Sequence, residues 1–114
     1  MNIGTSLSAL NAFTVQMDVT ANNVANVNTN GFKSSSVTLE NGQGQTVKAG
    51  VTANNSSYSM ALNTSNGNGA EELSNVDIVN EMTQLIPTLH AYDANLKMIE
   101  ANIETRGTLI NMVV

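Results

Sequence analysis

Two apolar stripes at heptad spacing occupy the two ends of the sequence, and a polar stretch separates them. Alternating steps of four and three residues place each stripe on one face of an α-helix. Neither helix can cover its own stripe, so the pattern predicts an antiparallel, coiled-coil-like hairpin of the N- and C-terminal helices in a mainly α protein. The N-terminal stripe consists of Ile3, Leu7, Leu10, Thr14, Met17, Ala21 and Val24, and the C-terminal stripe of Ile78, Met82, Leu85, Leu89, Tyr92, Leu96, Ile99, Ile103, Arg106, Ile110 and Val113.

The predicted helices span residues 2–27 and 74–114. Ser74 precedes Asp77 by three residues, which indicates an N-cap at Ser74 followed by an acid in the first turn. Pro87 lies inside the second helix, where a proline lacks one backbone donor and clashes with the preceding turn, at about 3 kcal/mol. We therefore expect a kink or a short break at Gln84–Pro87.

The middle of the chain is rich in Asn, Ser, Thr and Gly and predicts either a small β element against the helices or partial disorder. Gly42 and Gly44 mark a turn between the first two candidate strands. We expect residues 1–27 and 75–114 to form one discontinuous helical domain, with 28–74 as a polar connecting segment. The candidate strands are Ser35–Glu40, Gln45–Thr52 and Ser57–Asn63, and the candidate linker is Asn63–Glu72.

Composition excludes several classes of protein. The 114 residues suffice for one domain, and 41% hydrophobic but only 4% aromatic residues predict a core of aliphatic side chains. A net charge of -5 argues against binding to nucleic acid or anionic lipid, and the absence of cysteine excludes disulfides and thiolate metal sites. No apolar run is long enough for a membrane span, and Met1–Leu10 lacks the features of a secretory signal, so no cleaved signal is expected.

Asparagine occurs five times between Asn22 and Asn30, at the end of the first predicted helix. Asn26 and Asn28 are placed to end the helix, because asparagine tolerates the left-handed conformation and can bond to free carbonyls. Asn30 and Gly31 predict a tight turn, after which Phe32 can fold back on the apolar stripe. Asn22 and Asn23 lie too early for a cap. They belong either to a solvated polar face or to a face that hydrogen-bonds to another backbone or to a like subunit.

Three motifs, at both ends of the chain and in order, resemble those of the bacterial flagellar axial proteins, the rod and hook family. Ala21–Asn26 followed by Asn28–Phe32 resembles the family's A-N-N-[LIV]-A-N run and its N-T-x-G-[FY] turn. Ser74–Met82 resembles its N-V-D-x-x-x-E-M motif, and Ala91–Asn95 its A-Y-x-A-N motif. The family often has proline at the position of Asn30, and the middle segment here matches none of the family's characteristic sequences.

This resemblance implies a structural subunit of the flagellar rod, or of the rod and hook assembly, that polymerises helically with itself and other rod or hook proteins. It also implies export through the flagellar type III apparatus to the periplasmic rod. The alternative is a cytoplasmic helical-hairpin adaptor or export chaperone. The expected assembly residues are Leu7, Leu10, Met17, Asn22, Asn23, Asn26, Gly31, Phe32, Asn75, Asp77, Met82, Tyr92, Asn95, Leu96, Ile99 and Arg106.

Catalysis finds little support in the sequence, and we expect neither an enzyme nor a cofactor or metal site. His90 is the single histidine, and a solvated side chain is favoured over a general base or a ligand. Asp77 and Glu81 are better interpreted as first-turn acids that complement the helix dipole than as a carboxylate pair. Arg106 interrupts the apolar stripe, and it either extends to solvent or pairs with a carboxylate of a neighbouring subunit.

Overall fold

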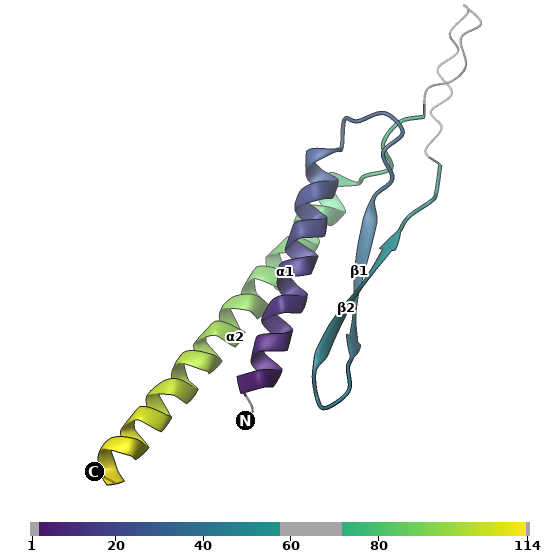
Figure 1. Ribbon diagram of the computed structural model, residues 1–114. Coiled ribbons are helices and arrows are strands. Elements are labelled where there is room, and N and C mark those ends of the chain that lie inside the picture. The colour runs from purple at the N-terminus through teal and green to yellow at the C-terminus, as the bar shows by residue number, and fades with distance from the viewer. Residues whose placement is uncertain (1–2, 58–71, 114) are drawn as a thin grey trace, which may run out of the picture.

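The structure is a computed structural model that describes residues 3–57 and 72–113. Its elements, in chain order, are α1 (Ile3–Ala25), β1 (Ser35–Asn41), β2 (Val47–Ala53) and α2 (Ile78–Val113). The two helices lie side by side and run in opposite directions, while α1 also contacts both strands (Figure 1). The predicted mainly α fold, with antiparallel terminal helices and a small β-rich middle, is confirmed.

The strands β1 and β2 form an antiparallel hairpin in which Leu39 lies opposite Ala49. The turn predicted from Gly42 and Gly44 is confirmed, because the Gly42 amide donates to the Thr46 carbonyl at 2.7 Å and Gly44 has a positive φ of 74°. The third candidate strand and the candidate linker fall almost wholly on residues outside the described part of the chain.

The second helix begins later than predicted, and its N-cap is Asp77 rather than Ser74. The Asp77 Oδ1 accepts hydrogen bonds from the amides of Val79 at 3.0 Å and Asn80 at 3.3 Å. An aspartate in this position satisfies two of the free donors at the helix start and places a negative charge at the positive end of the dipole. The Ser74 hydroxyl instead accepts a bond from the Val76 amide at 3.3 Å, before the helix begins.

Of the kink or short break predicted at Gln84–Pro87, the break is wrong, because α2 continues through Pro87 to Val113, while the kink stays a prediction. Pro87 is exposed, and it lines an open space on the surface between α2 and α1 with Phe13 and Gln16. The next residue, Thr88, is buried, and its hydroxyl donates to the Gln84 carbonyl at 2.8 Å. Contacts with the first helix therefore hold the second helix together across a residue that would weaken it in isolation.

The stripe predicted for the first helix is only partly the face that packs. Leu10 is buried, but Leu7 is 53% exposed. The buried and half-buried positions that follow steps of three and four are mostly small or polar, and we call them the α1 inner row. These residues are Ser6, Ala9, Phe13, Gln16, Thr20 and Asn23.

The face of α2 that packs is likewise rotated from the predicted stripe. Leu85, Tyr92 and Ile99 belong to both, but the other apolar members of the stripe, from Ile78 to Val113, are exposed. Polar residues take several of their places on the packed face, and no buried side-chain nitrogen or oxygen within the described residues lacks a partner. The α2 inner row consists of Glu81, Leu85, Thr88, Tyr92, Asn95, Ile99 and Asn102.

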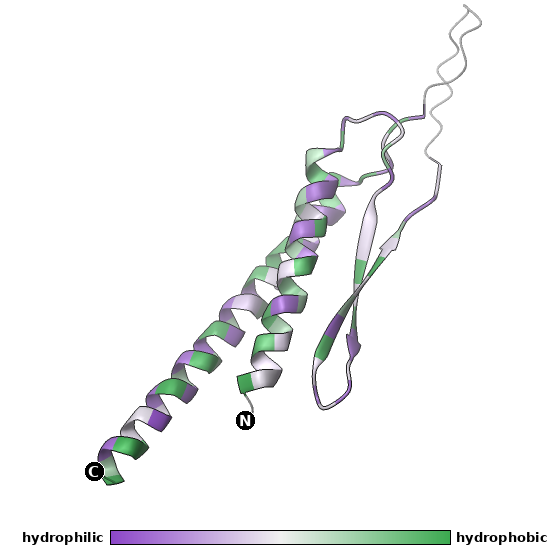
Figure 2. Ribbon diagram, in the orientation of Figure 1, coloured by the Kyte–Doolittle hydropathy of each residue, from purple (hydrophilic) through white to green (hydrophobic). Residues whose placement is uncertain are grey.

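Hydropathy alternates along both helices, with green apolar and purple polar segments in every part of α2 (Figure 2). Among the described residues, neither helix combines the length and the apolar character needed to cross a bilayer.

Candidate assembly surface

Asn23 joins three elements at one end of the helical hairpin. Its side chain is 1% exposed. The Nδ2 group donates to the Ser35 carbonyl at 2.7 Å and to Glu81 Oε1 at 2.9 Å, while Oδ1 accepts from the Ser35 amide at 2.9 Å. We call Asn23, Ser35 and Glu81 the Asn23 cluster. It confirms that Asn23 hydrogen-bonds to another backbone, and the alternative of a solvated polar face is wrong for this residue.

A second amide, Asn75, connects the chain entering α2 to both ends of the β-hairpin. Its Oδ1 accepts from the Ser34 amide at 2.6 Å, and its Nδ2 donates to the carbonyls of Asn54 at 2.8 Å and Ser56 at 2.9 Å. The backbone N–H of Asn75 also donates to the Phe32 carbonyl at 3.3 Å. Every polar group of this side chain therefore holds a backbone segment in place.

The end of the first helix confirms the carbonyl bond predicted for Asn26, but the left-handed conformation is found at neither Asn26 nor Asn28. The Asn26 side chain donates to the Asn22 carbonyl at 2.9 Å, which satisfies a carbonyl in the last turn. The following turn is closed by the Phe32 amide, which donates to the Thr29 carbonyl at 3.1 Å. Gly31 has a φ of 72° there, a conformation that glycine adopts without strain. Its amide donates to the Glu72 carbonyl and so draws the chain before α2 against the turn.

An ion pair between Lys33 and Glu72 lies beside this turn. The hydrogen bond from Lys33 lowers the pKa of the Glu72 carboxyl below 4.5, and a hydrogen bond with Ser57 adds to this effect. The pair is partly exposed, so solvent screens it. It connects the segment after α1 to the segment before α2, as Gly31 and Asn75 also do.

A row of apolar side chains on an adjacent face of α2 is exposed, and no part of residues 3–57 or 72–113 covers it. We call it the α2 outer row. Scattered apolar residues are normal on a surface, but an apolar row that recurs along one face of a helix is typical of a site of interaction, even though Asp93 and Glu100 interrupt this one. The row consists of Val79, Met82, Ile86, Leu89, Leu96, Ile103 and Ile110, which are 38% to 69% exposed.

The second helix also extends beyond the first. Asn102 is its last half-buried residue, and every position from Ile103 to Val113 is exposed. We call Ile103–Val113 the α2 extension. Figure 1 shows it, in yellow, running past the start of α1. Arg106 lies within it and is exposed.

The other predicted assembly residues divide by burial. Some pack inside the fold and others remain accessible to a neighbour. Leu10 and Asn23 are buried, Met17, Asn26, Phe32, Asn75, Tyr92, Asn95 and Ile99 are half-buried, and Leu7, Asn22, Gly31, Asp77, Met82, Leu96 and Arg106 are exposed. Sequence reasoning missed Ser35 and Thr88 and gave Glu81 only a dipole role. Heptad spacing from Leu85 could have placed Glu81 and Thr88 on the inner row, but no local signal identifies Ser35.

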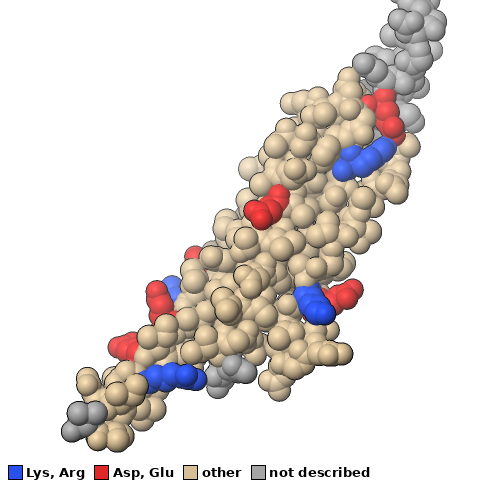
Figure 3. All heavy atoms as spheres, in the orientation of Figure 1, with Lys and Arg blue, Asp and Glu red and all other residues tan. Residues whose placement is uncertain are grey.

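Charged side chains are scattered singly or in small groups over the face shown in Figure 3. Within residues 3–57 and 72–113, no group of three or more His, Asp or Glu side chains could hold a metal ion. The distinctive features of the described surface are therefore the uncovered apolar row and the α2 extension.

The two helices form an antiparallel hairpin. The β-hairpin follows α1 in the chain, precedes α2 and packs against α1. Two family models match the chain: the model described as flagella basal body rod protein matches residues 3–33, and the model described as flagellar basal body rod FlgEFG protein C-terminal matches residues 68–112. Together they cover about two thirds of the chain, in the expected order. A comparison with curated proteins finds no significant match.

The chain belongs to the flagellar basal body rod protein family, which confirms the resemblance seen in its terminal motifs. Membership supports a structural role in the flagellar basal body and association with other rod components. The first match covers α1 and the turn through Gly31, and the second covers α2 with the segment that holds Asn75.

Proposed function

We propose that this protein is a structural subunit of the flagellar rod that polymerises helically through its terminal helices. The observation that carries the proposal is the α2 outer row, which remains uncovered in a helix that matches a rod protein family. In this arrangement residues 1–27 and 75–114 form the assembly unit, and residues 28–74 connect its two parts.

Burial of the outer row supplies the driving force for assembly. Full burial of one aliphatic side chain contributes about 1.5–3 kcal/mol, so seven partly exposed side chains supply on the order of 10 kcal/mol. Association opposes this with an estimated loss of about 4–15 kcal/mol in translational and rotational freedom. The row alone therefore gives marginal pairing, and contacts with several neighbours produce a stable assembly.

Two exposed polar residues add specificity in this proposal. Asn22 presents its amide to solvent beside the buried Asn23, where it is placed to bond to a like subunit. Arg106 lies in the α2 extension beyond the reach of α1, where it is placed to pair with a carboxylate of a neighbour. The chain has a structural and not a catalytic role, and it reaches the periplasmic rod through the flagellar type III export apparatus.

A deletion strain tests the proposal. We expect loss of motility and incomplete rods by electron microscopy of purified basal bodies, both restored by the intact gene. A tagged, functional copy should be recovered with purified hook–basal bodies. A cytoplasmic adaptor or export chaperone would instead remain in the cytosolic fraction, and intact rods in the deletion strain would contradict the structural role.

A further inference from the structure

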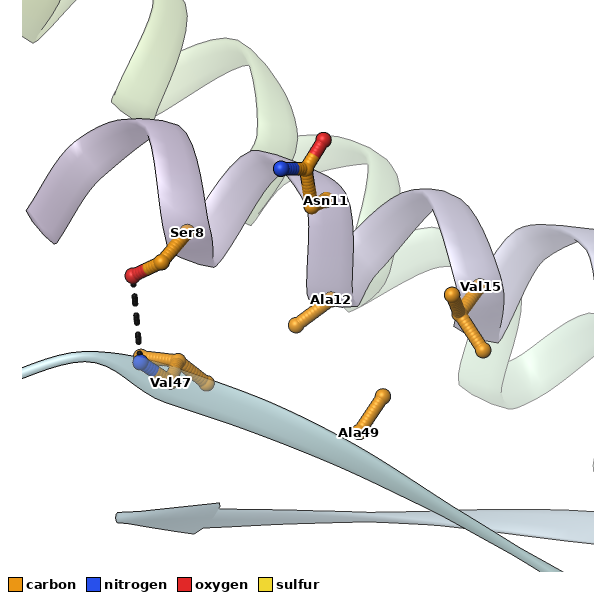
Figure 4. A pocket seen from close by; sticks show the side chains of 6 residues that line it. All are labelled: Ser8, Asn11, Ala12, Val15, Val47 and Ala49. Carbon is orange, nitrogen blue, oxygen red and sulfur yellow. Dashed lines mark hydrogen bonds between the residues drawn. The ribbon is translucent and has the colours of Figure 1, made fainter. Parts of the chain in front are cut away.

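A groove lies between α1 and β2, on the side of α1 away from α2 (Figure 4). Its cavity volume is about 220 Å³, enough for one or two aliphatic side chains. The Val47 amide donates to the Ser8 hydroxyl at 3.1 Å and ties the strand to the helix at one end of the groove. The groove stays open because its walls carry small side chains. The lining residues are Ser8, Asn11, Ala12, Val15, Val47 and Ala49.

The groove is uncharged and mostly apolar. None of its lining residues is ionisable, and Ala12 and Ala49 face each other across it (Figure 4). Val51, which is 53% exposed, follows Val47 and Ala49 on the same face of β2 and extends the apolar wall. Such a surface accepts aliphatic side chains and disfavours charged ones.

The α2 extension offers side chains of this kind. Its last seven described residues, Gly107–Val113, include no charged residue. Leu109, Ile110, Met112 and Val113 are 54% to 87% exposed, and Met112 and Val113 have the highest exposed fractions among the large hydrophobic residues of the described chain. The cores of protein interfaces are depleted of charge on both sides, so the extension and the groove are matched in chemistry.

The extension cannot enter the groove of its own chain. The inner rows place the start of α1 near Asn102 of α2. Ala12 lies along α1 on one side of this level, and Ile110 lies along α2 on the other side. At a rise of 1.5 Å per residue, the two residues are about 25 Å apart along the helix axes. Because α2 is one continuous helix to Val113, it does not turn back across this distance. An α2 extension that occupies this groove must therefore come from a second copy.

We propose that the α2 extension of one copy packs its aliphatic side chains into the α1–β2 groove of a second copy. The inference deepens the proposed function and rests on it for the identity of the neighbour. The contact joins different surfaces of the two copies with an axial offset of about 25 Å. Such a heterologous contact repeats without closing on itself, which is the geometry of an open helical assembly.

Cysteine crosslinking tests the contact directly, because the chain has no cysteine of its own. Two purified single variants, Ala49→Cys and Ile110→Cys, are mixed at high concentration and oxidised mildly. We expect a disulfide-linked heterodimer at least about fivefold more abundant than with Thr52→Cys in place of Ala49→Cys. Thr52 is the matched control, because it is exposed on the opposite face of the same strand. Circular dichroism verifies that each variant keeps its helices.

The outcomes separate this inference from the proposed function. Heterodimer formation no greater than with Thr52→Cys overturns the groove contact, as does crosslinking dominated by Ile110→Cys homodimers. If the tagged protein is nevertheless found in basal bodies, the structural role stands and only the groove contact fails. If the heterodimer forms but the deletion strain builds intact rods, the contact stands and the rod function fails.

Discussion

The two ends of the helical hairpin differ in how their surfaces are satisfied. At one end Asn23 is buried and bonds to α1's two neighbours, Ser35 of β1 and Glu81 of α2. At the other end every residue of the α2 extension is exposed, and Ile110 and Met112 are more than half accessible. Polar side chains define the fold at the first end, while apolar side chains at the second end are left exposed by residues 3–57 and 72–113.

The end of the helix pair with Asn23 therefore stabilises the fold, whereas the end with the α2 extension is available for assembly. Amide hydrogen bonds are directional, so Asn23 and Asn75 specify how the hairpin and both helices meet. Apolar contact is non-directional, so the extension can pack against several neighbours with little change in geometry. Substitutions at the two ends should therefore affect different measurements.

The largest loss of stability should follow Asn23→Ala. The substitution removes the hydrogen-bond partner of the Ser35 backbone amide, the Ser35 carbonyl and the Glu81 carboxylate. We therefore expect the free energy of unfolding to fall by about 3 kcal/mol. Urea denaturation followed by circular dichroism measures this. Asn22→Ala is the matched control, with a change within about 0.5 kcal/mol because its side chain is exposed. Equal effects would show that the cluster does not organise this end.

Ile99→Asp should be the next most damaging change. Ile99 is half-buried on the α2 inner row, whereas Leu96 is 38% exposed on the outer row. Aspartate at position 99 should disrupt the pairing of the helices and lower the free energy of unfolding by about 2–3 kcal/mol, against about 1 kcal/mol or less at position 96. A larger effect of Leu96→Asp on denaturation would mean that the face of α2 that carries Leu96, and not the inner row with Ile99, packs against α1.

Pro87→Ala should stabilise the protein. The substitution restores a backbone donor in a continuous helix, and we expect a gain of about 2 kcal/mol, seen as a higher melting temperature. Gln84→Ala, one turn earlier on the same helix, is the control for the change in helix propensity. An unchanged or lower melting temperature would indicate that packing of the ring against Phe13 and Gln16 outweighs the missing bond.

Ile103→Asp should affect assembly and leave the fold intact. Ile103 is 60% exposed, so the free energy of unfolding should change by no more than about 0.5 kcal/mol. The concentration needed for self-association in sedimentation should rise about tenfold, equivalent to about 1.4 kcal/mol. Ala94→Asp is the matched control, since it adds the same charge at an exposed position of α2 outside both the outer row and the α2 extension. Unaltered association would remove the outer row from the interface.

The smallest effect should come from Glu72→Gln. The hydrogen bond from Lys33 lowers the pKa of Glu72 in the folded state, so the pair stabilises the fold at neutral pH. This contribution is complete above the ordinary pKa of 4.5 and is lost as the pH falls through the lower folded-state pKa. Melting temperatures from about pH 3 to pH 7 should show a shallower acid decline for the variant than for the wild type. Parallel curves would mean that the pair does not contribute.

Local sequence patterns were enough to predict the helices, the β-hairpin and the turn at Gly31. Heptad spacing predicted the two helices, alternation and Gly44 predicted the β-hairpin, and the asparagine run predicted the turn at Gly31. These features depend on a few neighbouring residues, whose conformational preferences act in the same way in any context. The break at Pro87 was wrong because proline's local preference is overridden by contacts with α1.

The sequence pattern could not show which face of each helix is buried in the folded chain. An apolar stripe is satisfied equally well by a partner within the chain or by another copy, so heptad spacing alone does not show that Leu10 is buried while Leu7 is exposed. That choice depends on where β1 places the Ser35 backbone, because only there can Asn23 replace its bonds to water and become buried. The sequence by itself determined which segments are helical and that they need partners. The tertiary structure decided which side chains the chain covers itself, because burial of an amide requires hydrogen-bond partners from distant parts of the sequence.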